Sequence, residues 1–236
     1  MSTLPVDIYS VAAVRETDRT AIEDQGIPGY TLMTRAGAAA VSEARSRFPN
    51  ACRWQVVCGA GNNAGDGYVV ARLAAQEGIT VSVVALVDPD LLKGDAATAY
   101  ADFAAGGGAV AAWAGQLDSE ADLVIDAMLG SGLERDVEGE FALAVAAINS
   151  HSGNVVALDI PTGIHGDTGR VMGFAVRADL TITFVGLKVG LFLGDGPEYS
   201  GHVAFADLGV PPQCRQAIKA ALRRVDDDHM RRALAP

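Results

Sequence analysis

Residues 56–67 read Val56-Val57-Cys58-Gly59-Ala60-Gly61-Asn62-Asn63-Ala64-Gly65-Asp66-Gly67, and they predict a buried strand that runs into a glycine-rich turn. The apolar run begins at Trp54, and the segment 68–77 has the spacing of a helix that Gly78 ends. Glycines in such a turn permit positive φ and let backbone N–H groups approach a ligand closely. The helix N-terminus adds partial positive charge, so the turn favours an anionic group such as a pyrophosphate.

The same turn partly matches the dinucleotide-binding fingerprint. Gly59-x-Gly61-x-x-Ala64 fits its loose form, and Asp88 ends the next predicted strand, where a ribose-binding acid would lie. Two features fit badly, because Asp66 places a carboxylate at the expected helix start and Asn62-Asn63 adds two side-chain amides. The turn therefore predicts a polar ligand with a cation nearby. The alternative is a plain strand–helix turn that Asp66 caps.

Composition narrows the class of protein. The chain has 236 residues, of which 50% are hydrophobic, which suits one large α/β domain. A net charge of −11 argues against nucleic acid or an anionic membrane surface as the main partner. No apolar run is long enough to span a membrane, and the first residues lack the features of a signal peptide. Three cysteines without metal-binding spacing favour a reducing compartment, so we expect a cytoplasmic protein.

Strands and helices alternate along most of the chain. Helices are predicted over 11–25 with Ser10 as cap, over 32–48 with Thr31 as cap, and over 91–105, 141–149 and 212–224. Strands are predicted over 54–58, 80–87, 109–113, 122–126, 155–160, 180–185 and 202–208. Small residues at 36–38 let the second helix pack closely, most simply on the sheet. This order predicts a three-layer α/β/α Rossmann-like fold with a mostly parallel central sheet. We expect one domain over 1–225, with 226–236 as a tail or the start of a linker.

Acidic residues follow three predicted strands. Asp66 follows the first strand, and Asp126 and Asp159 end two later ones. Ligands of open α/β sheets bind beyond the carboxyl ends of the strands, at the point where the strand order reverses. Any one of these acids could be a helix cap or a loop anchor. Together, beside Gly, Asn and Thr residues, they predict a polar site.

Oxygen ligands for a cation occur near the same strand ends. The Asn63 amide, the Asp126 carboxylate and the Thr162 hydroxyl are hard ligands, and one carboxylate among neutral oxygens favours K⁺ or Na⁺ over Ca²⁺. No set of cysteines and histidines favours zinc. Lys188 either reaches the site or is a salt-bridged or exposed lysine.

These residues together resemble the YjeF N-terminal domain family, the NAD(P)H-hydrate (NAD(P)HX) epimerases. The similarity covers most of the chain, from the Leu32-Met33-x-x-Ala36-Gly37 helix to Asp207-Leu208-Gly209-Val210-Pro211. The motifs that carry it are Gly-x-Gly-Asn-Asn-x-Gly-Asp-Gly at 59–67, the segment Val124–Leu133, Asp159-Ile160-Pro161-Thr162-Gly163, and Thr181-x-Thr183-Phe184 before Lys188-x-Gly190.

The resemblance implies an isomerase of nicotinamide nucleotide repair, which interconverts the R and S forms of hydrated NADH and NADPH at the nicotinamide C6. It implies K⁺ as cofactor, held by Asn63, Asp126 and Thr162, and Asp159 as the catalytic acid/base. The implied substrate contacts are Asn62, Asn63, Ala64, Gly65, Asp66, Gly130, Ser131, Gly132, Leu133, Glu134, Arg135, Asp136 and Asp159. Ala64 stands where the family usually has glycine, and Thr162 where it usually has serine. For Asp159 to give and take a proton, we expect its pKa to be raised toward neutrality.

The resemblance also implies partners. It predicts a homodimer and a dehydratase, dependent on ADP or ATP, that acts on one epimer and is either fused or separate. The charged segment after Arg224 is typical of a linker, so we expect the front half of a bifunctional repair enzyme. Two alternatives are a non-catalytic scaffold or nucleotide-binding module of the same fold and an ordinary NAD dehydrogenase domain. The retained acids argue against the scaffold, and the Asn62-Asn63 turn argues against the dehydrogenase.

Overall fold

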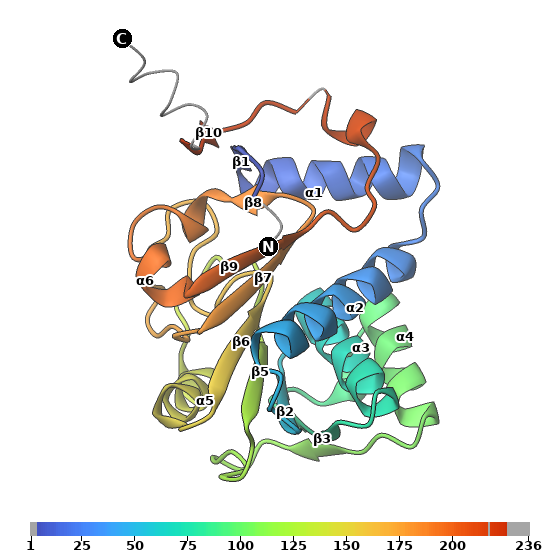
Figure 1. Cartoon of the computed structure of the whole chain (residues 1–236), viewed down its shortest axis with the longest axis vertical. Helices are drawn as coiled ribbons and strands as arrows, with labels where there is room; N and C mark the ends of the chain where they lie inside the picture. Colours follow the sequence, from blue (N-terminus) through green and yellow to red (C-terminus); the bar gives the residue numbers. More distant parts are fainter. Residues whose placement is uncertain (1–3, 217, 226–236) are drawn as a thin grey trace.

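The computed structural model describes residues 4–216 and 218–225, and a parallel seven-stranded sheet forms its centre (Figure 1). The strand order is β4-β3-β2-β5-β6-β7-β9, so it reverses between β2 and β5. The bounds are β2 Arg53–Cys58, β3 Thr80–Ala85, β4 Val110–Ala112, β5 Leu123–Ala127, β6 Asn154–Leu158, β7 Leu180–Phe184 and β9 His202–Ala206. Buried strands rich in Val, Ile and Leu are typical of a sheet covered on both faces. The predicted parallel sheet is confirmed.

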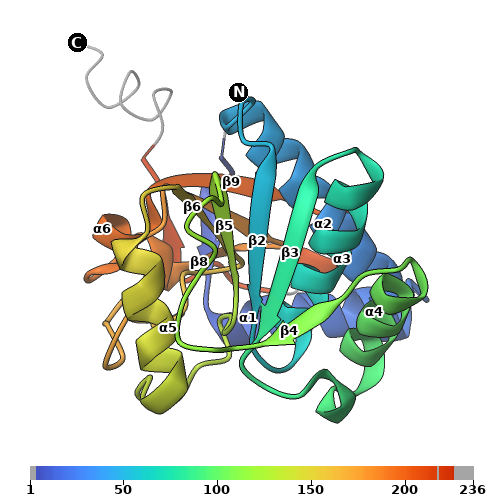
Figure 2. The ribbon, with the colours of Figure 1, turned by 90° about the horizontal axis from the view of Figure 1, so that it is seen from below.

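Helices cover both faces of the sheet (Figures 1 and 2). One face carries α2 Gly29–Arg47, α3 Asn62–Gln76 and α4 Gly94–Ala105, and the other carries α5 Gly139–Ser150 and the short α6 Gly196–Ser200. Each face has its own cluster of buried side chains, the larger one beneath α2 and α3. Single 3₁₀ turns occupy Pro89–Leu91, Val189–Leu191 and Pro212–Arg215. The three-layer Rossmann-like prediction is therefore confirmed. Within the described residues, no helix is both long and apolar enough to cross a membrane.

Helix α1, Val11–Arg19, lies across one end of the sheet and continues into a π-helical turn, Thr20–Asp24 (Figure 1). The predicted Ser10 cap is confirmed, since the Ala13 N–H donates to Ser10 Oγ over 3.2 Å. The predicted Thr31 cap is wrong. Helix α2 begins three residues earlier, directly after Pro28, whose fixed φ suits the position before a helix.

A second, three-stranded sheet joins both ends of the described chain. It has the order β10-β1-β8, with β1 Asp7–Tyr9, β8 Leu187–Lys188 and β10 Leu222–Arg223. The predicted helix over 212–224 is wrong, because this stretch holds only the 3₁₀ turn and β10 in its described part. The backbone N–H groups of Ala221 and Arg224 donate instead to carbonyls of the β1 segment. Strands of two or three residues leave no periodic pattern, so the sequence could not predict this sheet.

Helix α3 begins at Asn62, six residues before the predicted start at 68. Gly61 takes φ +78° and turns the chain directly into the helix. The glycines that made this stretch look like a loop serve close packing. A Cβ at Gly67 would lie 2.5 Å from the Ala127 Cβ of β5. Asp66 therefore sits in the second turn of α3, and the prediction that it marks the helix start is wrong.

Close packing of α2 at Gly37 is confirmed, but its partner is α3 and not the sheet. A Cβ on Gly37 would lie 2.3 Å from Val69 Cγ1 and 3.3 Å from the Val70 backbone nitrogen. Glycine at this position lets the two helices approach to a distance that alanine forbids. The contact fixes α3, and with it the turn at its N-terminus.

Gly37→Ala is expected to lower the free energy of unfolding by about 1–2 kcal/mol, because overpacking outweighs the gain in helix propensity. Chemical denaturation measures the loss. Ala38→Ser, on the exposed side of the same helix, is the control and should change stability by less than about 0.5 kcal/mol. A Gly37→Ala protein as stable as the wild type would contradict the packing argument.

Candidate active site

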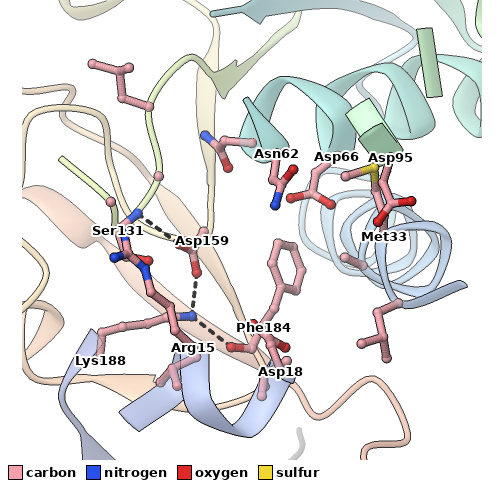
Figure 3. Close-up of a pocket in the computed structure, with 18 of the residues that line it drawn as sticks. Arg15, Asp18, Met33, Asn62, Asp66, Asp95, Ser131, Asp159, Phe184 and Lys188 are labelled. Atoms are coloured by element: carbon pink, nitrogen blue, oxygen red, sulfur yellow. Dashed lines mark hydrogen bonds and ion pairs between the residues drawn. The ribbon is translucent and has the colours of Figure 1, made fainter. Parts of the chain in front are cut away.

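A cavity of about 670 Å³ opens at the carboxyl ends of β2 and β5, where the strand order reverses (Figure 3). The segments after β2, β5 and β6 form its floor. Helix α1 and the first turns of α2 form its walls. The cavity is therefore where the sequence predicted it from strand ends and glycine turns.

Most of the predicted substrate contacts line this cavity: Asn62, Asn63, Asp66, Gly130, Ser131, Gly132, Leu133, Glu134, Arg135 and Asp159. The structure places the other three away from the lining. Ala64 and Gly65 are buried in the first turn of α3, where a Cβ on Gly65 would meet the Met33 side chain. Asp136 lies beside the backbone of Gly173.

Asp159 is held firmly at the end of β6. Its φ of +67° is uncommon for a residue other than glycine and turns the side chain toward the loop after β5. One carboxylate oxygen, Oδ2, accepts the Ser131 N–H over 3.0 Å, and the other accepts the Lys188 ammonium. The side chain of Asp159 keeps 16% exposure, so a ligand in the cavity can reach it.

Lys188 is the buried partner of Asp159, with 1% of its side chain exposed. Its ammonium donates to Asp159 and, over 2.8 Å, to the Phe184 carbonyl (Figure 3). It also donates to Thr183 Oγ1 over 3.0 Å. All three donors of the ammonium are thus engaged. The parallel pairing of Tyr9 with Lys188 places this lysine, which answers the question that the sequence left open.

The pKa of Asp159 lies below its ordinary value, contrary to the expectation of a raised one. Burial by itself raises the pKa, but the charge and hydrogen bond of Lys188, together with the Ser131 N–H, outweigh it. Asp159 is therefore a carboxylate at neutral pH. The expectation was wrong because it took burial into account without the lysine.

Two other acids in the cavity behave in the opposite way. Burial raises the pKa of Asp66 well above its ordinary value, and the charges of Asp159 and Asp18 raise it further. Burial raises the pKa of Asp18 to about 6, the Lys188 charge lowers it, and the Asp159 charge adds to the rise. The cavity therefore combines one ionised carboxylate with two that hold protons more tightly.

Helix α1 contributes to the cavity wall, which the sequence did not predict. Val14, Asp18 and Ile22 follow at helical spacing along the face that lines the cavity, and Arg15 extends it. The Arg15 guanidinium lies over the glycine loop, where a Cβ on Gly132 would come within 2.7 Å of Nη2. Periodicity can identify a face of this helix, but it gives no sign of what that face covers.

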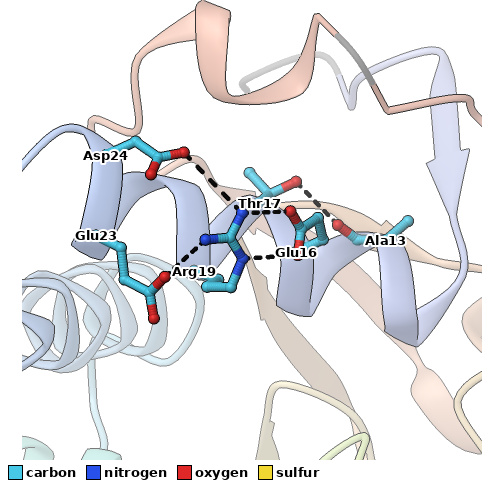
Figure 4. A network of polar contacts seen from close by, with 6 residues as sticks. All are labelled: Ala13, Glu16, Thr17, Arg19, Glu23 and Asp24. Atoms are coloured by element: carbon cyan, nitrogen blue, oxygen red, sulfur yellow. Dashed lines mark hydrogen bonds and ion pairs between the residues drawn. The ribbon is translucent and has the colours of Figure 1, made fainter.

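The neighbouring face of α1 is exposed and carries a separate polar network (Figure 4). Arg19 donates to Glu16 over 2.7 Å and to Glu23 over 2.6 Å, and lies 4.0 Å from Asp24. The hydrogen bonds that Arg19 donates to Glu16 and Glu23 raise its pKa. Exposed ion pairs of this kind contribute little to stability. The network lies on the solvent face of α1, whereas Val14, Asp18 and Ile22 lie on its cavity face.

The predicted cation ligands lie beneath the cavity floor and at its edge. Asp126 is fully buried and accepts the Thr162 hydroxyl over 2.7 Å, the Thr162 N–H over 2.8 Å and the Met128 N–H over 3.2 Å. Burial raises the pKa of Asp126 to about 6 against the effect of these hydrogen bonds. Asn63 is 7% exposed, and both atoms of its amide lack a hydrogen-bond partner within the described chain. A buried amide without partners costs about 1–3 kcal/mol, which fits a ligand that completes it.

Residues 29–190 match the family model described as YjeF-related protein N-terminus. The chain belongs to this family. It is 39% identical to the Bifunctional NAD(P)H-hydrate repair enzyme Nnr of Escherichia coli over 88% of this chain and 40% of that protein. It is 38% identical to the NAD(P)H-hydrate epimerase of Limosilactobacillus fermentum over 84% of this chain and 95% of that protein. The chain thus spans less than half of the bifunctional relatives that it matches.

The fold of this YjeF-related chain is also that of the yeast protein ynu0 (YNL200c), with a TM-score of 0.78 and 17% identity. The likeness covers 95% of this chain and 98% of the yeast chain. The family match begins at residue 29, so α1, with Arg15 and Asp18, lies before the matched segment. The cavity wall that the sequence missed therefore comes from outside the segment that the family model matches.

Lys188→Met is expected to lower the free energy of unfolding at about pH 7 by about 3–5 kcal/mol, because a carboxylate that is mostly buried loses its cation. The folded-state pKa of Asp159 lies below the unfolded one, so the ion pair stabilises above the unfolded pKa. This contribution is lost as the pH falls through the folded pKa. The cost of Lys188→Met should therefore shrink on acidification.

Urea denaturation between about pH 3 and pH 8 measures this dependence. Lys93→Met, which removes an exposed lysine, is the control and should have a small effect at every pH. If Lys188→Met lowers the free energy of unfolding by the same amount at every pH, the loss reflects packing alone and not the ion pair.

Proposed function

We propose that this chain is an NAD(P)H-hydrate epimerase, an isomerase that interconverts the R and S forms of hydrated NADH and NADPH at the nicotinamide C6. The observation that carries the proposal is Asp159, kept ionised by Lys188 at the floor of a cavity at the strand-order reversal. The relative from Limosilactobacillus fermentum carries the same name. An epimerase needs a base beside the carbon that it inverts, and Asp159 is placed and charged for that role.

The C6 hydroxyl lies on a carbon next to a ring nitrogen, and inversion there requires one proton to be delivered and another removed. Asp159 retains lone pairs on both oxygens after it has accepted Lys188 and Ser131. The carboxylate can therefore take a proton from the substrate or from water without leaving its partners. Asp66, which holds its proton more tightly, donates a hydrogen bond to the substrate.

The rest of the dinucleotide lies along the glycine turns. The start of α3 at Asn62 and the loop Gly130–Arg135, apart from the Ser131 N–H that Asp159 accepts, supply backbone N–H groups for the pyrophosphate. Arg15 and Arg135 line the same cavity and add positive charge near the loop. The chain as a whole has a net charge of −11, so these local positive charges are needed for a substrate with two phosphates.

K⁺ is proposed as the cofactor, held by Asn63, Asp126 and Thr162. The orphaned amide of Asn63 and an all-oxygen donor set with one carboxylate suit a monovalent cation. When bound, K⁺ supplies a fixed positive charge that offsets repulsion among the carboxylates. With K⁺ bound, the side chains of Asn63 and Thr162 would hold it from the segments after β2 and β6.

The working unit is proposed to span residues 1–225 and to form a homodimer in the cytoplasm. Residues 226–236, proposed as a tail or linker, lie outside the described residues. The epimer that this unit releases is proposed to feed an ADP- or ATP-dependent dehydratase, fused or separate. Proximity of the two sites would raise the local concentration of the shared intermediate.

Asp159→Asn keeps the shape of the side chain and removes the base, so epimer exchange should fall by about 10²–10⁴-fold. Exchange between the R and S forms is followed by NMR or HPLC. Asp90→Asn, at an exposed site far along the chain, is the matched control and should retain full activity. Near-normal exchange in a folded Asp159→Asn protein would remove Asp159 from the mechanism.

Binding of K⁺ should raise the thermal stability of the protein relative to choline at equal ionic strength, by about 2.7 kcal/mol at a concentration of 100 times Kd. Asp126→Ala should abolish the effect, Asp126→Asn should retain part of it, and Asp90→Ala should leave it unchanged. Crystals grown with Rb⁺ or Tl⁺ should show an anomalous peak among the oxygens of Asn63, Asp126 and Thr162. Absence of that peak at high ion concentration would disprove the site.

A further inference from the structure

Asp18 is a carboxylate of the cavity wall with no assigned role. It lies on α1, half-buried, and faces the cavity that Asp159 and Lys188 occupy (Figure 3). Its neighbour Arg19 is engaged by exposed acids, whereas Asp18 forms no ion pair with any residue in the described part of the chain. A partly buried carboxylate without a cationic partner carries a desolvation cost, which marks it as a functional candidate.

Charged groups from several elements surround Asp18. Lys188 comes from β8, Asp159 from the segment after β6, Asp66 from α3 and Arg215 from the C-terminal 3₁₀ turn. Arg15 lies one helical turn away on the same cavity face of α1. Asp18 and Asp159 therefore reach the cavity from different walls, one from a helix and one from a strand end.

Inversion of a carbon that bears a hydroxyl needs two groups, because the hydroxyl leaves from one face and returns to the other. A single carboxylate held by Lys188 and Ser131 serves only the face that it touches. We propose that Asp18 is a second acid/base residue of the epimerase, which serves the face of the nicotinamide ring that Asp159 does not reach. This inference rests on the proposed function.

The reaction balances with these two groups and water. Protonated Asp18 gives its proton to the C6 hydroxyl, the C6–O bond breaks, and the leaving group is water. The lone pair on the ring nitrogen forms a double bond to C6. Water then adds to the opposite face of C6, and its proton passes to Asp159. The reverse epimerisation uses the same two groups in exchanged roles.

The protonation states of the two acids agree with these roles. Burial raises the pKa of Asp18 to about 6, whereas Lys188 holds the pKa of Asp159 below its ordinary value. A pKa close to the working pH lets a group both give and recover a proton. The more strongly raised pKa of Asp66 suits a group that keeps its proton and donates a hydrogen bond.

Asp18→Asn tests the proposal, with exchange of R and S NADHX followed by NMR between about pH 5 and pH 9 and the enzyme-free rate subtracted. The wild type should lose activity above about pH 6, as Asp18 loses its proton. Asp18→Asn should lower kcat by about 10²–10⁴-fold with a smaller change in KM. The loss of activity above about pH 6, the alkaline limb of the pH profile, should vanish in this variant. Asp18→Glu should restore part of the rate, and its loss of activity at high pH should return at a shifted pH.

Asp24→Asn is the matched control, because it removes an exposed carboxylate next to the same helix and should keep both rate and profile. A wild type without exchange would refute the proposed function itself. An active wild type with an Asp18→Asn variant that retains the rate and the limb would refute only the role of Asp18. Loss of the limb in Asp66→Asn but not in Asp18→Asn would assign the second group to Asp66. If Asp18→Asn does not fold, the profile of Asp18→Glu decides, since an unshifted limb would overturn the proposal.

Discussion

The ion pair between Lys188 and Asp159 is the interaction on which the site depends. A buried lysine is costly unless each donor finds an acceptor, and here the acceptors come from the ends of β6 and β7. Asp159 and Val185 both take positive φ at these ends, +67° and +65°. Such strain persists where the surrounding structure fixes the backbone, and it tends to gather at functional sites. The backbone at these strand ends therefore orients the acceptors of Asp159, Thr183 and Phe184 toward the Lys188 ammonium.

The Lys188 ammonium also makes the pKa of Asp159 differ from the pKa values of the other acids in the cavity. Without Lys188, burial would push the pKa of all three carboxylates upward, and none would be a ready base at neutral pH. The ammonium reverses this effect for Asp159 alone, because it touches only that carboxylate. Asp66 and Asp18 stay with raised pKa values. One contact thus creates a difference in protonation between groups of the same chemical type, which is what acid/base chemistry needs.

The sequence predicted the parallel sheet and a polar site at its strand ends, because buried strands and glycine turns leave strong local patterns. The family resemblance, and not these patterns, implied ten of the residues that line the cavity. It failed where long-range contacts decide. The lowered pKa of Asp159 depends on Lys188, which a two-residue strand brings in from 29 positions along the chain. The role of α1 depends on which elements its cavity face meets. The predicted C-terminal helix failed for the same reason, since its backbone groups pair with β1. The start of α3 was misplaced because glycines that serve packing resemble those of a loop.

The small sheet explains why the segments outside residues 29–190 belong to the site. Strand β1 holds Lys188 by pairing with β8 and leads directly into α1, so one short strand positions both the lysine and the helix wall of the cavity. Strand β10 covers the other side of β1, and Arg215 donates to the strained Val185 carbonyl over 2.7 Å. The contacts that keep Asp159 ionised and those that place Asp18 on the wall of the same cavity therefore share one support. A change in the terminal segments would therefore alter the surroundings of both Asp18 and Asp159, although Asp159 itself belongs to neither segment.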